Sequence, residues 1–359
     1  MDVKKLKDKL REPEGIKNFV QKSISFQEDL EIIKYINSGS CGIVWEGQDK
    51  KYNRNVALKF IINKINEEKR ERREQHQLKE YHRQKLLSQK EKELNRKEFN
   101  LQRKLKHKNI TTLYGIYDID GSCSCLVMEL GRYGDLNNFH NNLLGKKTLS
   151  ETLLAYFTNQ ILNGLHYCHK SKIIHMDIKH QNILIDKNLN VKLADLSVSF
   201  SYANYKDDEL VSLPLAGTSP FMSPEILERK SIKALDCNKV DMFSLGTLLF
   251  NLCYRKYPYD LEIKDKNNFD EIKEKIKRNE LLFPESTNRS ETFKSFLSKL
   301  LSKHLSQRYS IEEAMKDKWM KAAQHIFLEK EKIGNLEKFL INMLSDNIKS
   351  FNDEITKYS

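Results

Sequence analysis

Two carboxylates, an amide and a lysine stand close together in the segment from His175 to Asp195. Asp177 can accept a proton from a hydroxyl nucleophile, and Lys179 can neutralise phosphate charge. Asn182 and Asp195 supply hard oxygen ligands of the kind that Mg²⁺ prefers. Catalysis of phosphoryl transfer depends mainly on positioning and charge stabilisation. The segment therefore favours phosphoryl-transfer chemistry, although its composition also suits a polar loop between a helix and a hairpin.

The flanking sequence predicts the elements that position these side chains. Residues 149–170 carry apolar positions at helical spacing, which predicts a helix that delivers the segment. Residues 183–185 and 191–193 are typical of two short strands joined by a turn. We expect the hairpin to gather the acids, the lysine and the amide at one of its ends. His175 is expected to pack and hydrogen-bond in the core rather than to perform acid–base chemistry.

A glycine-bearing turn lies upstream, between strand-like runs at residues 31–36 and 43–45. Gly39 and Gly42 would let backbone N–H groups approach a phosphate without a Cβ in the way. By itself this pattern favours a plain hairpin turn. It gains weight only in combination with the other segments.

Together these segments resemble the motifs of eukaryotic protein kinases. Residues 175–182 match the catalytic loop H-R-D-x-K-x-x-N, with Met176 at the arginine position. Residues 56–59, Val-Ala-Leu-Lys, are similar to the strand motif V-A-I-K. Asp195 stands at the first position of D-F-G, and Ser197 replaces the glycine. The resemblance covers roughly residues 30–320.

The glycine-rich motif of the family, G-x-G-x-x-G-x-V, is matched less closely. Gly39, Gly42 and Val44 agree with it, whereas Asn37 replaces the first glycine. Asn tolerates unusual backbone angles better than most residues, so the departure is mild. The resemblance implies that these four residues help to bind the nucleotide.

For the remaining chemistry, the resemblance implies ATP and Mg²⁺ as cofactors. Asp177 would orient and deprotonate the acceptor hydroxyl, and Lys179 would stabilise the transferring γ-phosphoryl group. Asn182 and Asp195 would hold the metal ion. These roles are expectations carried over from the family at the matching positions.

Nucleotide binding would also involve residues before the catalytic loop. Lys59 would hold the α- and β-phosphates and pair with Glu98 on the next helix, unless both are ordinary surface residues. Asp135 is expected either to bind the ribose or to cap the helix that follows. The resemblance implies that the adenine contacts the following residues: Ala57, Met128, Glu129, Gly131 and Leu184.

The segment from Asp195 to Glu225 resembles the activation segment of the family. Its residues indicate which hydroxyl groups the protein phosphorylates and how its activity is regulated. Residues 217–222, Gly-Thr-Ser-Pro-Phe-Met, resemble the corresponding loop of serine/threonine kinases, and Lys179 agrees with this type. Met176 cannot bind an activation-segment phosphate as the usual arginine does, so weak dependence on such phosphorylation is expected. The available hydroxyls are those of Ser199, Ser201, Tyr202, Tyr205 and Ser212.

Three further matches are expected to be structural. Glu225, in a motif that resembles A-P-E, should pair with Arg308, and removal of either would leave a buried charge unpaired. Asp241, in a segment similar to D-x-W-S-x-G, should bind backbone N–H groups of the catalytic loop.

The composition allows a sizeable core and restricts the partners. The 359 residues suffice for one large domain or two lobes, with 39% hydrophobic and 31% charged residues. The net charge of +12 could favour anionic partners, but a well-solvated basic surface accounts for it better. No aromatic-interleaved basic motif is present, so nucleic acid is not an expected partner. Protein substrates are.

Several features of the sequence bear on the cellular location of the protein. The N-terminus lacks the apolar core of a signal peptide, and Asp2 stands where myristoylation requires glycine. The longest apolar stretch, at residues 243–253, is too short and too polar to span a membrane. The six cysteines form no C-x-x-C pair, which is typical of free thiols in a reducing compartment. We expect an intracellular protein, in the cytoplasm or the nucleus.

The predicted fold is α+β, the two-lobed protein kinase fold, over residues 26–320. A small β-rich lobe would span 26–130, and a larger helical lobe 131–320, with ATP between them. Residues 1–25 show little apolar periodicity and predict a flexible or loosely docked leader.

Two regions depart from a minimal kinase. Residues 63–96 are an insertion of mostly charged residues, either a helical spacer, favoured slightly, or the site of a regulatory partner. Residues 321–359 are typical of an amphipathic helix that packs on the larger lobe or binds a partner.

The sequence thus predicts a serine/threonine protein kinase. The alternative is a pseudokinase that binds nucleotide or serves as a scaffold, an idea motivated by Asn37, Met176 and Ser197. Against it stands the presence of every charged residue that touches phosphate or metal in the family.

Overall fold

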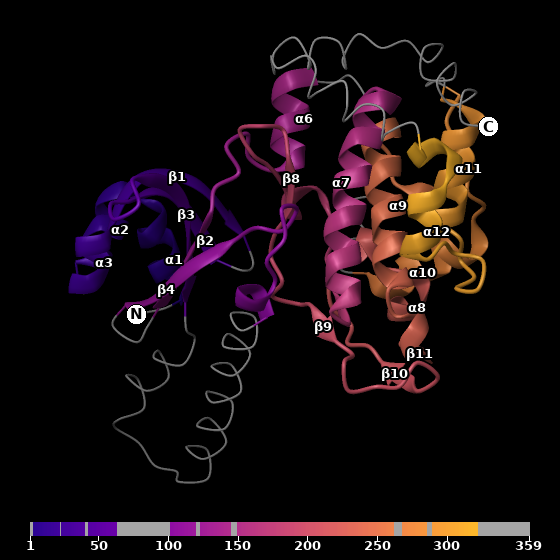
Figure 1. The fold of residues 1–359 in the computed structure, drawn as a ribbon, viewed down its shortest axis with the longest axis horizontal. Coiled ribbons are helices and arrows are strands. Elements are labelled where there is room, and N and C mark those ends of the chain that lie inside the picture. Colours follow the sequence, from indigo (N-terminus) through magenta and orange to yellow (C-terminus); the bar gives the residue numbers. More distant parts are fainter. Residues whose placement is uncertain are drawn as a thin grey trace. The chain divides into compact units, whose positions relative to one another are not determined.

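The computed structural model describes residues 3–21, 23–39, 42–62, 101–119, 123–144, 149–261, 268–285 and 289–321. The chain divides into two compact units (Figure 1). The small unit comprises residues 1–106 and 111–131, and the large unit comprises residues 107–110 and 132–359. The first contains the main sheet and the second most of the helices, which confirms the predicted α+β class.

The small unit is built on a five-stranded antiparallel sheet with the order β1-β2-β3-β5-β4. Adjacent runs of β-branched and aromatic residues form these strands, as their composition favours. Their bounds are β1 Leu30–Gly39, β2 Gly42–Asp49, β3 Arg54–Ile62, β4 Leu113–Ile119 and β5 Cys123–Glu129.

Strand alternation gives this sheet two different faces. Residues opposite each other in a ladder share a face, and neighbours along a strand point to opposite faces. Trp45, Leu58 and Val127 are aligned across β2, β3 and β5 and belong to the buried core of the small unit. The adjacent row, Val44, Lys59 and Leu126, therefore lies on the other face of the sheet.

Helices from the N-terminal segment cover the core face of the sheet. They are α1 (Val3–Arg11), α2 (Pro13–Val20) and α3 (Ile24–Asp29). The indole Nε1 of Trp45 donates to the carbonyl of Leu10 over 3.0 Å. Apolar side chains of these helices join the sheet core, namely Leu6, Leu10, Ile16, Phe19, Val20 and Phe26.

Of the two alternatives expected for residues 1–25, a flexible leader and a loosely docked one, the described residues of this segment agree with docking. Apolar residues do recur at helical spacing in both α1 and α2, but each helix is short and the two are separated at Pro13, which obscures the pattern in the sequence. Their burial depends on a sheet face formed by later strands. Gly15 allows the close approach, because a Cβ there would overlap the carbonyl oxygen of Lys9.

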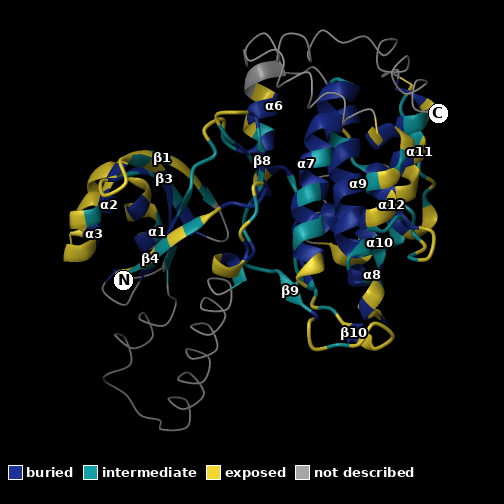
Figure 2. Cartoon of the chain, viewed as in Figure 1, coloured by how far each residue is buried: buried dark blue, intermediate teal, exposed yellow. Residues whose placement is uncertain are grey.

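The large unit is mainly helical. Its longest helices, α7 (Glu151–Lys170) and α9 (Lys239–Tyr254), are buried along most of their length (Figure 2). Ser150 starts α7 by accepting a hydrogen bond from the backbone N–H of Leu153, as expected for an N-cap. The other helices are α6 (Leu136–Leu144), α8 (Pro224–Leu227), α10 (Phe269–Arg278), α11 (Glu291–Leu300) and α12 (Ile311–Lys316).

The described residues of the large unit also form three two-stranded ladders. β7 (Ile183–Ile185) pairs with β8 (Val191–Leu193), which confirms the predicted hairpin. β6 (Ile173–Ile174) pairs with β9 (Phe200–Ser201), and β10 (Leu210–Ser212) pairs with β11 (Ser231–Lys233).

Several expectations fall on residues outside the described ranges. They concern the insertion at 63–96, Glu98 and the tail from residue 322 onward. Within the ranges that the structure describes, no helix has both the length and the apolar character to cross a membrane.

The docked N-terminal helices predict a stability effect at Ile16. This side chain is fully buried, so Ile16→Ala should lower the free energy of unfolding of the small unit by about 2–5 kcal/mol. Unfolding in urea can be followed by the fluorescence of Trp45 in a Trp319→Phe background. Asn18→Ala, an exposed change in the same helix, should cost less than about 0.5 kcal/mol. Equal effects of the two changes would show that the helices are not docked.

Candidate active site

A compact hydrogen-bonded cluster surrounds the carboxylate of Asp177. The Lys179 ammonium lies 2.6 Å from Oδ2 and donates to the Thr218 hydroxyl over 2.7 Å. The same hydroxyl donates to Asp177 Oδ1 over 2.7 Å, and the Asn182 amide donates to Oδ2 over 2.9 Å. The carboxylate of Asp177 is therefore held in one orientation, which is the positioning that a base for a hydroxyl proton requires.

Asp241 fixes the backbone of the loop that carries Asp177. Its two carboxylate oxygens accept from the backbone N–H groups of His175 and Met176, both over 2.8 Å. Oδ2 also accepts from Nε2 of His169 over 2.8 Å. Burial raises the pKa of Asp241, but the hydrogen bond and the charge of His169 outweigh it and bring the pKa below its ordinary value. The predicted structural role of Asp241 is confirmed.

Two of the non-glycine residues with positive φ in the described part of the chain belong to the site. Met176 and Asp195 both have left-handed backbone angles, with φ of 65° and 64°. Such residues cost about 1–3 kcal/mol each and are typical of functional sites. Gly217 lets the segment that precedes Thr218 approach the catalytic loop closely, because a Cβ on Gly217 would overlap the Met176 carbonyl oxygen.

His175 links the loop to the strand that precedes Asp195. Its Nε2 lies 3.0 Å from the carbonyl oxygen of Ala194, which can only accept, so this nitrogen carries the proton. The backbone N–H of Ala194 donates to the carbonyl of Asn182 over 2.9 Å. His175 is fully buried, as predicted, and these contacts connect the segments that carry Asn182 and Asp195.

The donor set of Asn182 and Asp195 fits a magnesium ion. Asn182 uses its amide nitrogen twice on Asp177, to the backbone carbonyl and to Oδ2. Its Oδ1 has no partner in the described part of the chain and is not sealed from solvent. An amide oxygen and a carboxylate are ligands suited to Mg²⁺. Among the described residues, no cluster of three or more His, Cys, Asp or Glu side chains offers a competing site.

The contacts of Asp135 are those of a helix N-cap. Its Oδ1 accepts from the backbone N–H of Asn138 over 2.8 Å, at the start of α6. Burial raises the pKa of this carboxyl, and the backbone hydrogen bonds oppose the rise. A ribose contact by Asp135 remains a separate prediction.

The candidate nucleotide residues of the small unit share one sheet face. Val44 and Leu126 flank Lys59 across the ladders, and Ala57 is paired with Met128. Lys59 is 6% exposed. This face is opposite to the one covered by α1–α3, so the ladder places the lysine beside an apolar row suited to an adenine.

The glycines of the predicted turn lie at the paired ends of β1 and β2. Gly39 pairs with Gly42, and Asn37 pairs with Val44. Gly42 has φ of 144°, and a Cβ there would lie 2.5 Å from the Phe60 carbonyl oxygen. Glycine is therefore required at this position for steric reasons.

A buried ion pair anchors the end of the activation segment. Arg308 donates from two nitrogens to the carboxylate of Glu225, over 2.6 and 3.0 Å, which confirms the predicted pair. Burial raises the pKa of Glu225, but the charge and hydrogen bonds of Arg308 outweigh it, so the pKa lies below its ordinary value of 4.5.

Sequence reasoning missed two participants. The motif around Thr218 indicates the type of acceptor but not that the Thr218 hydroxyl bridges Lys179 and Asp177. His169 was not singled out, and a histidine in the last turn of a buried helix was the available signal for a partner to Asp241. Within the large unit, the structure groups Asp177, Lys179 and Asn182 as expected.

Comparisons with known proteins agree with this geometry. The protein kinase domain family matches residues 30–320. The chain is similar to an Aurora kinase of Dictyostelium discoideum, with 29% identity over 309 residues, covering 86% of this chain and 70% of that protein. It is also similar to death-associated protein kinase 2 of Mus musculus and of Homo sapiens. Each is 30% identical over 246 residues, which cover 68% of this chain and 63% of the relative.

The chain therefore belongs to the protein kinase family. It is a serine/threonine protein kinase. Members of this family use ATP and Mg²⁺.

The buried pair predicts a stability loss that depends on pH. Arg308→Met should lower the free energy of unfolding by about 3–5 kcal/mol at neutral pH, because it leaves a buried carboxylate unpaired. In the wild type, the depressed pKa of Glu225 contributes stability above pH 4.5 that is lost as the pH falls toward the folded-state pKa. The difference between the two proteins should therefore shrink on acidification below pH 4.5.

Urea unfolding at several pH values checks this expectation. Arg278→Met is the matched control, since its partner Glu274 and its own side chain are exposed and the pair is worth less than about 1 kcal/mol. A difference that is equal for the two variants, or that grows toward acid pH, would contradict the assigned role of Arg308.

Proposed function

We propose that this protein transfers the γ-phosphoryl group of ATP to serine or threonine hydroxyls of protein substrates through the Asp177 cluster. The observation that carries the assignment is the carboxylate of Asp177, held between Lys179, Thr218 and Asn182. Its oxygens are oriented before any substrate arrives, and positioning supplies much of the catalysis in this reaction.

In this mechanism, Asp177 accepts the proton of the acceptor hydroxyl as the new bond to phosphorus forms. Thr218 and Lys179 keep the carboxylate in one orientation. The Lys179 ammonium would balance the negative charge of the transferring group. The hydroxyl of the substrate would be the acceptor, and ADP the leaving group.

The metal and the nucleotide are assigned by donor chemistry. Asn182, through its available Oδ1, and Asp195 would hold Mg²⁺, which neutralises the phosphate charge when bound. Lys59 would bind the α- and β-phosphates. The adenine would contact Val44, Ala57, Met128 and Leu184, together with the backbone of 129–131. Asp135 would contact the ribose.

No observation favours the pseudokinase alternative. The departures at Asn37, Met176 and Ser197 leave the contacts of Asp177 intact. Met176 is buried, and its backbone N–H makes the expected bond to Asp241.

We also propose an intracellular location and two sites for a regulatory partner. Every cysteine in the described part of the chain is a free, buried thiol, which agrees with a reducing intracellular compartment. The insertion at 63–96 and the tail at 321–359 are candidate sites for a regulatory partner.

Removal of the base tests the reaction. Asp177→Asn should lower kcat by at least about 10²-fold, because the amide cannot accept the hydroxyl proton. The measurement is transfer of labelled phosphate from Mg·ATP to a generic serine/threonine protein. Asp208→Asn, an exposed change in the same unit, should leave kcat unchanged. Turnover by Asp177→Asn at the wild-type rate would refute the assignment.

The activation segment is held by contacts that need no phosphate. β10 forms a ladder with β11, and Lys172 binds Asp207 over 2.8 Å. Tyr202 is buried and is therefore a poor site for modification. With Met176 in place of arginine, these contacts take over the ordering of the segment.

The dephosphorylated enzyme should therefore keep most of its activity. The wild type is treated with a phosphatase, its loss of phosphate is verified by mass spectrometry, and kcat is compared before and after. A change of less than about threefold is expected, since the ladder and the ion pair persist. Near-total loss of activity would show that a phosphate orders the segment.

A further inference from the structure

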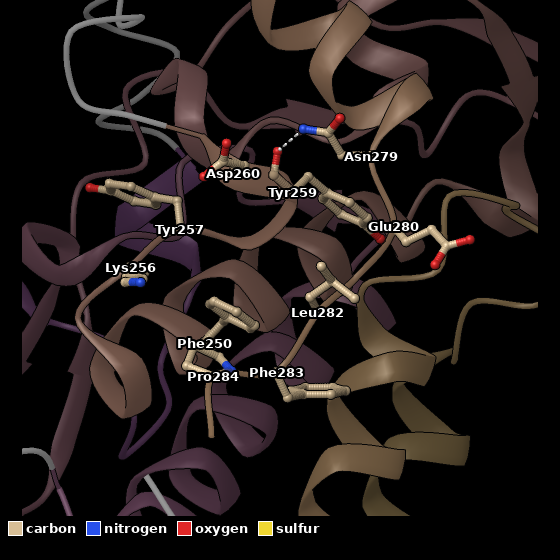
Figure 3. A pocket seen from close by; sticks show the side chains of 10 residues that line it. All are labelled: Phe250, Lys256, Tyr257, Tyr259, Asp260, Asn279, Glu280, Leu282, Phe283 and Pro284. Carbon is tan, nitrogen blue, oxygen red and sulfur yellow. Dashed lines mark hydrogen bonds between the residues drawn. The ribbon is translucent and has the colours of Figure 1, made fainter. Parts of the chain in front are cut away.

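A cavity of about 590 Å³ opens in the large unit, lined by none of the residues assigned to catalysis. It lies between the C-terminal end of α9, the turn at 256–260 and the segment at 279–284 (Figure 3). Most of its wall is apolar. The aromatic and aliphatic lining comes from Phe250, Tyr257, Tyr259, Leu282, Phe283 and Pro284.

One wall of the cavity has strained backbone angles and is held in place by hydrogen bonds and a ring contact. Tyr259 and Asp260 are consecutive left-handed residues, with φ of 59° and 56°, although neither is glycine. The Tyr259 hydroxyl donates to the carbonyl of Leu301, and its carbonyl accepts from the Asn279 amide over 3.0 Å. The Tyr259 ring is parallel to that of Phe243 at 6.4 Å. A wall fixed in this way loses little entropy when a ligand binds.

The opposite wall exposes apolar surface and free backbone groups. Leu282 is 73% exposed, although leucine is usually buried. Residues 281–284 are in neither helix nor strand, and their backbone groups have no hydrogen-bond partner in the described part of the chain. Such a segment can pair with an extended peptide, while a neighbouring pocket receives one of its side chains.

The cavity is connected by ring contacts to the catalytic loop. Tyr257 meets Phe221 edge-on at 5.7 Å, and Phe221 meets His180 edge-on at 5.6 Å. Phe221 ends the short 3₁₀ helix that follows Thr218, and His180 lies between Lys179 and Asn182. A peptide in the cavity would therefore lie near the segment that orients Asp177.

The lining of the cavity carries two acidic side chains and one basic side chain. Asp260 and Glu280 are exposed and lie on different sides of the group of lining residues (Figure 3). Neither has an ion-pair partner in the described part of the chain, and Lys256 is the one cation of the lining. This acidic rim occurs in a chain with a net charge of +12.

We propose that this cavity is a docking site for an extended segment of protein substrates. One bulky apolar side chain of the segment enters the cavity beside Leu282, and flanking basic residues meet Asp260 and Glu280. The proposal rests on the proposed kinase function, because it specifies the substrates of that catalytic site.

Binding is tested with a fluorescein-labelled peptide, Gly-Arg-Ile-Phe-Ile-Arg-Gly, by fluorescence anisotropy with the full chain. Leu282→Ser should weaken binding at least fivefold. The double change Asp260→Asn with Glu280→Gln should weaken it at least threefold and reduce its dependence on salt. Leu235→Ser removes an exposed leucine of the same unit outside the cavity and should change the affinity less than twofold.

Two altered peptides test the chemistry of the occupant. Replacement of the three central residues by Ala, or of both Arg by Glu, should weaken binding at least tenfold. The proposal is overturned if the parent peptide shows no saturable binding up to about 1 mM, if the Glu peptide binds as well, or if Leu282→Ser has no effect. Concentration-dependent dimerisation that Leu282→Ser abolishes would assign the cavity to a second copy of the chain instead.

A kinetic measurement separates this proposal from the proposed function. A serine acceptor peptide joined by a Gly-Ser linker to the docking peptide should have a KM at least fivefold below that of the acceptor alone. Leu282→Ser should remove this advantage in KM without changing kcat. The variant Asp177→Asn should bind the docking peptide normally. Normal binding without phosphorylation of either substrate would refute the kinase function, whereas equal KM values would refute docking.

Discussion

The large unit depends on one fully buried carboxylate, that of Asp241. A buried charge without partners costs several kcal/mol, and here the partners are two backbone N–H groups of the catalytic loop and one histidine of α7. The carboxylate therefore imposes one loop conformation, including the left-handed backbone of Met176. Asp177 is the next residue in the chain after Met176, so this constraint also determines the orientation of Asp177.

The small unit obeys a simpler constraint, the alternation of side chains along β-strands. The N-terminal helices cover the face that carries Trp45 and Leu58, so polar function is confined to the opposite face. Lys59 is on that face because it is one residue removed from Leu58. A shift of one residue in register would place the lysine in the apolar core.

The sequence predicted the residues whose identity and spacing are set by chemistry or by buried charge. Asp177 and Asn182 are in contact as their motif implied, and Glu225 binds Arg308 across 83 positions of the chain. The α+β class also followed from the motifs. These features are local patterns or charges that cannot be buried without a partner.

The remaining features depend on surfaces that form only in the folded chain. Leu10 and Trp45 meet between a short helix and a strand, and nothing in either segment alone indicates the other. The sequence therefore left open whether the N-terminal segment is flexible or docked. The cavity beside Leu282 is likewise assembled from α9, a turn and a later segment without any motif. The bridging role of Thr218 required distances rather than residue types.

The central claim is that Lys59 of the small unit and Asp195 of the large unit each bind Mg·ATP. Calorimetric titration of Mg·ATP into the wild type, Lys59→Met and Asp195→Asn tests it most directly. We predict that each change weakens binding at least about tenfold while the fold is retained. Wild-type affinity in either variant would contradict the account.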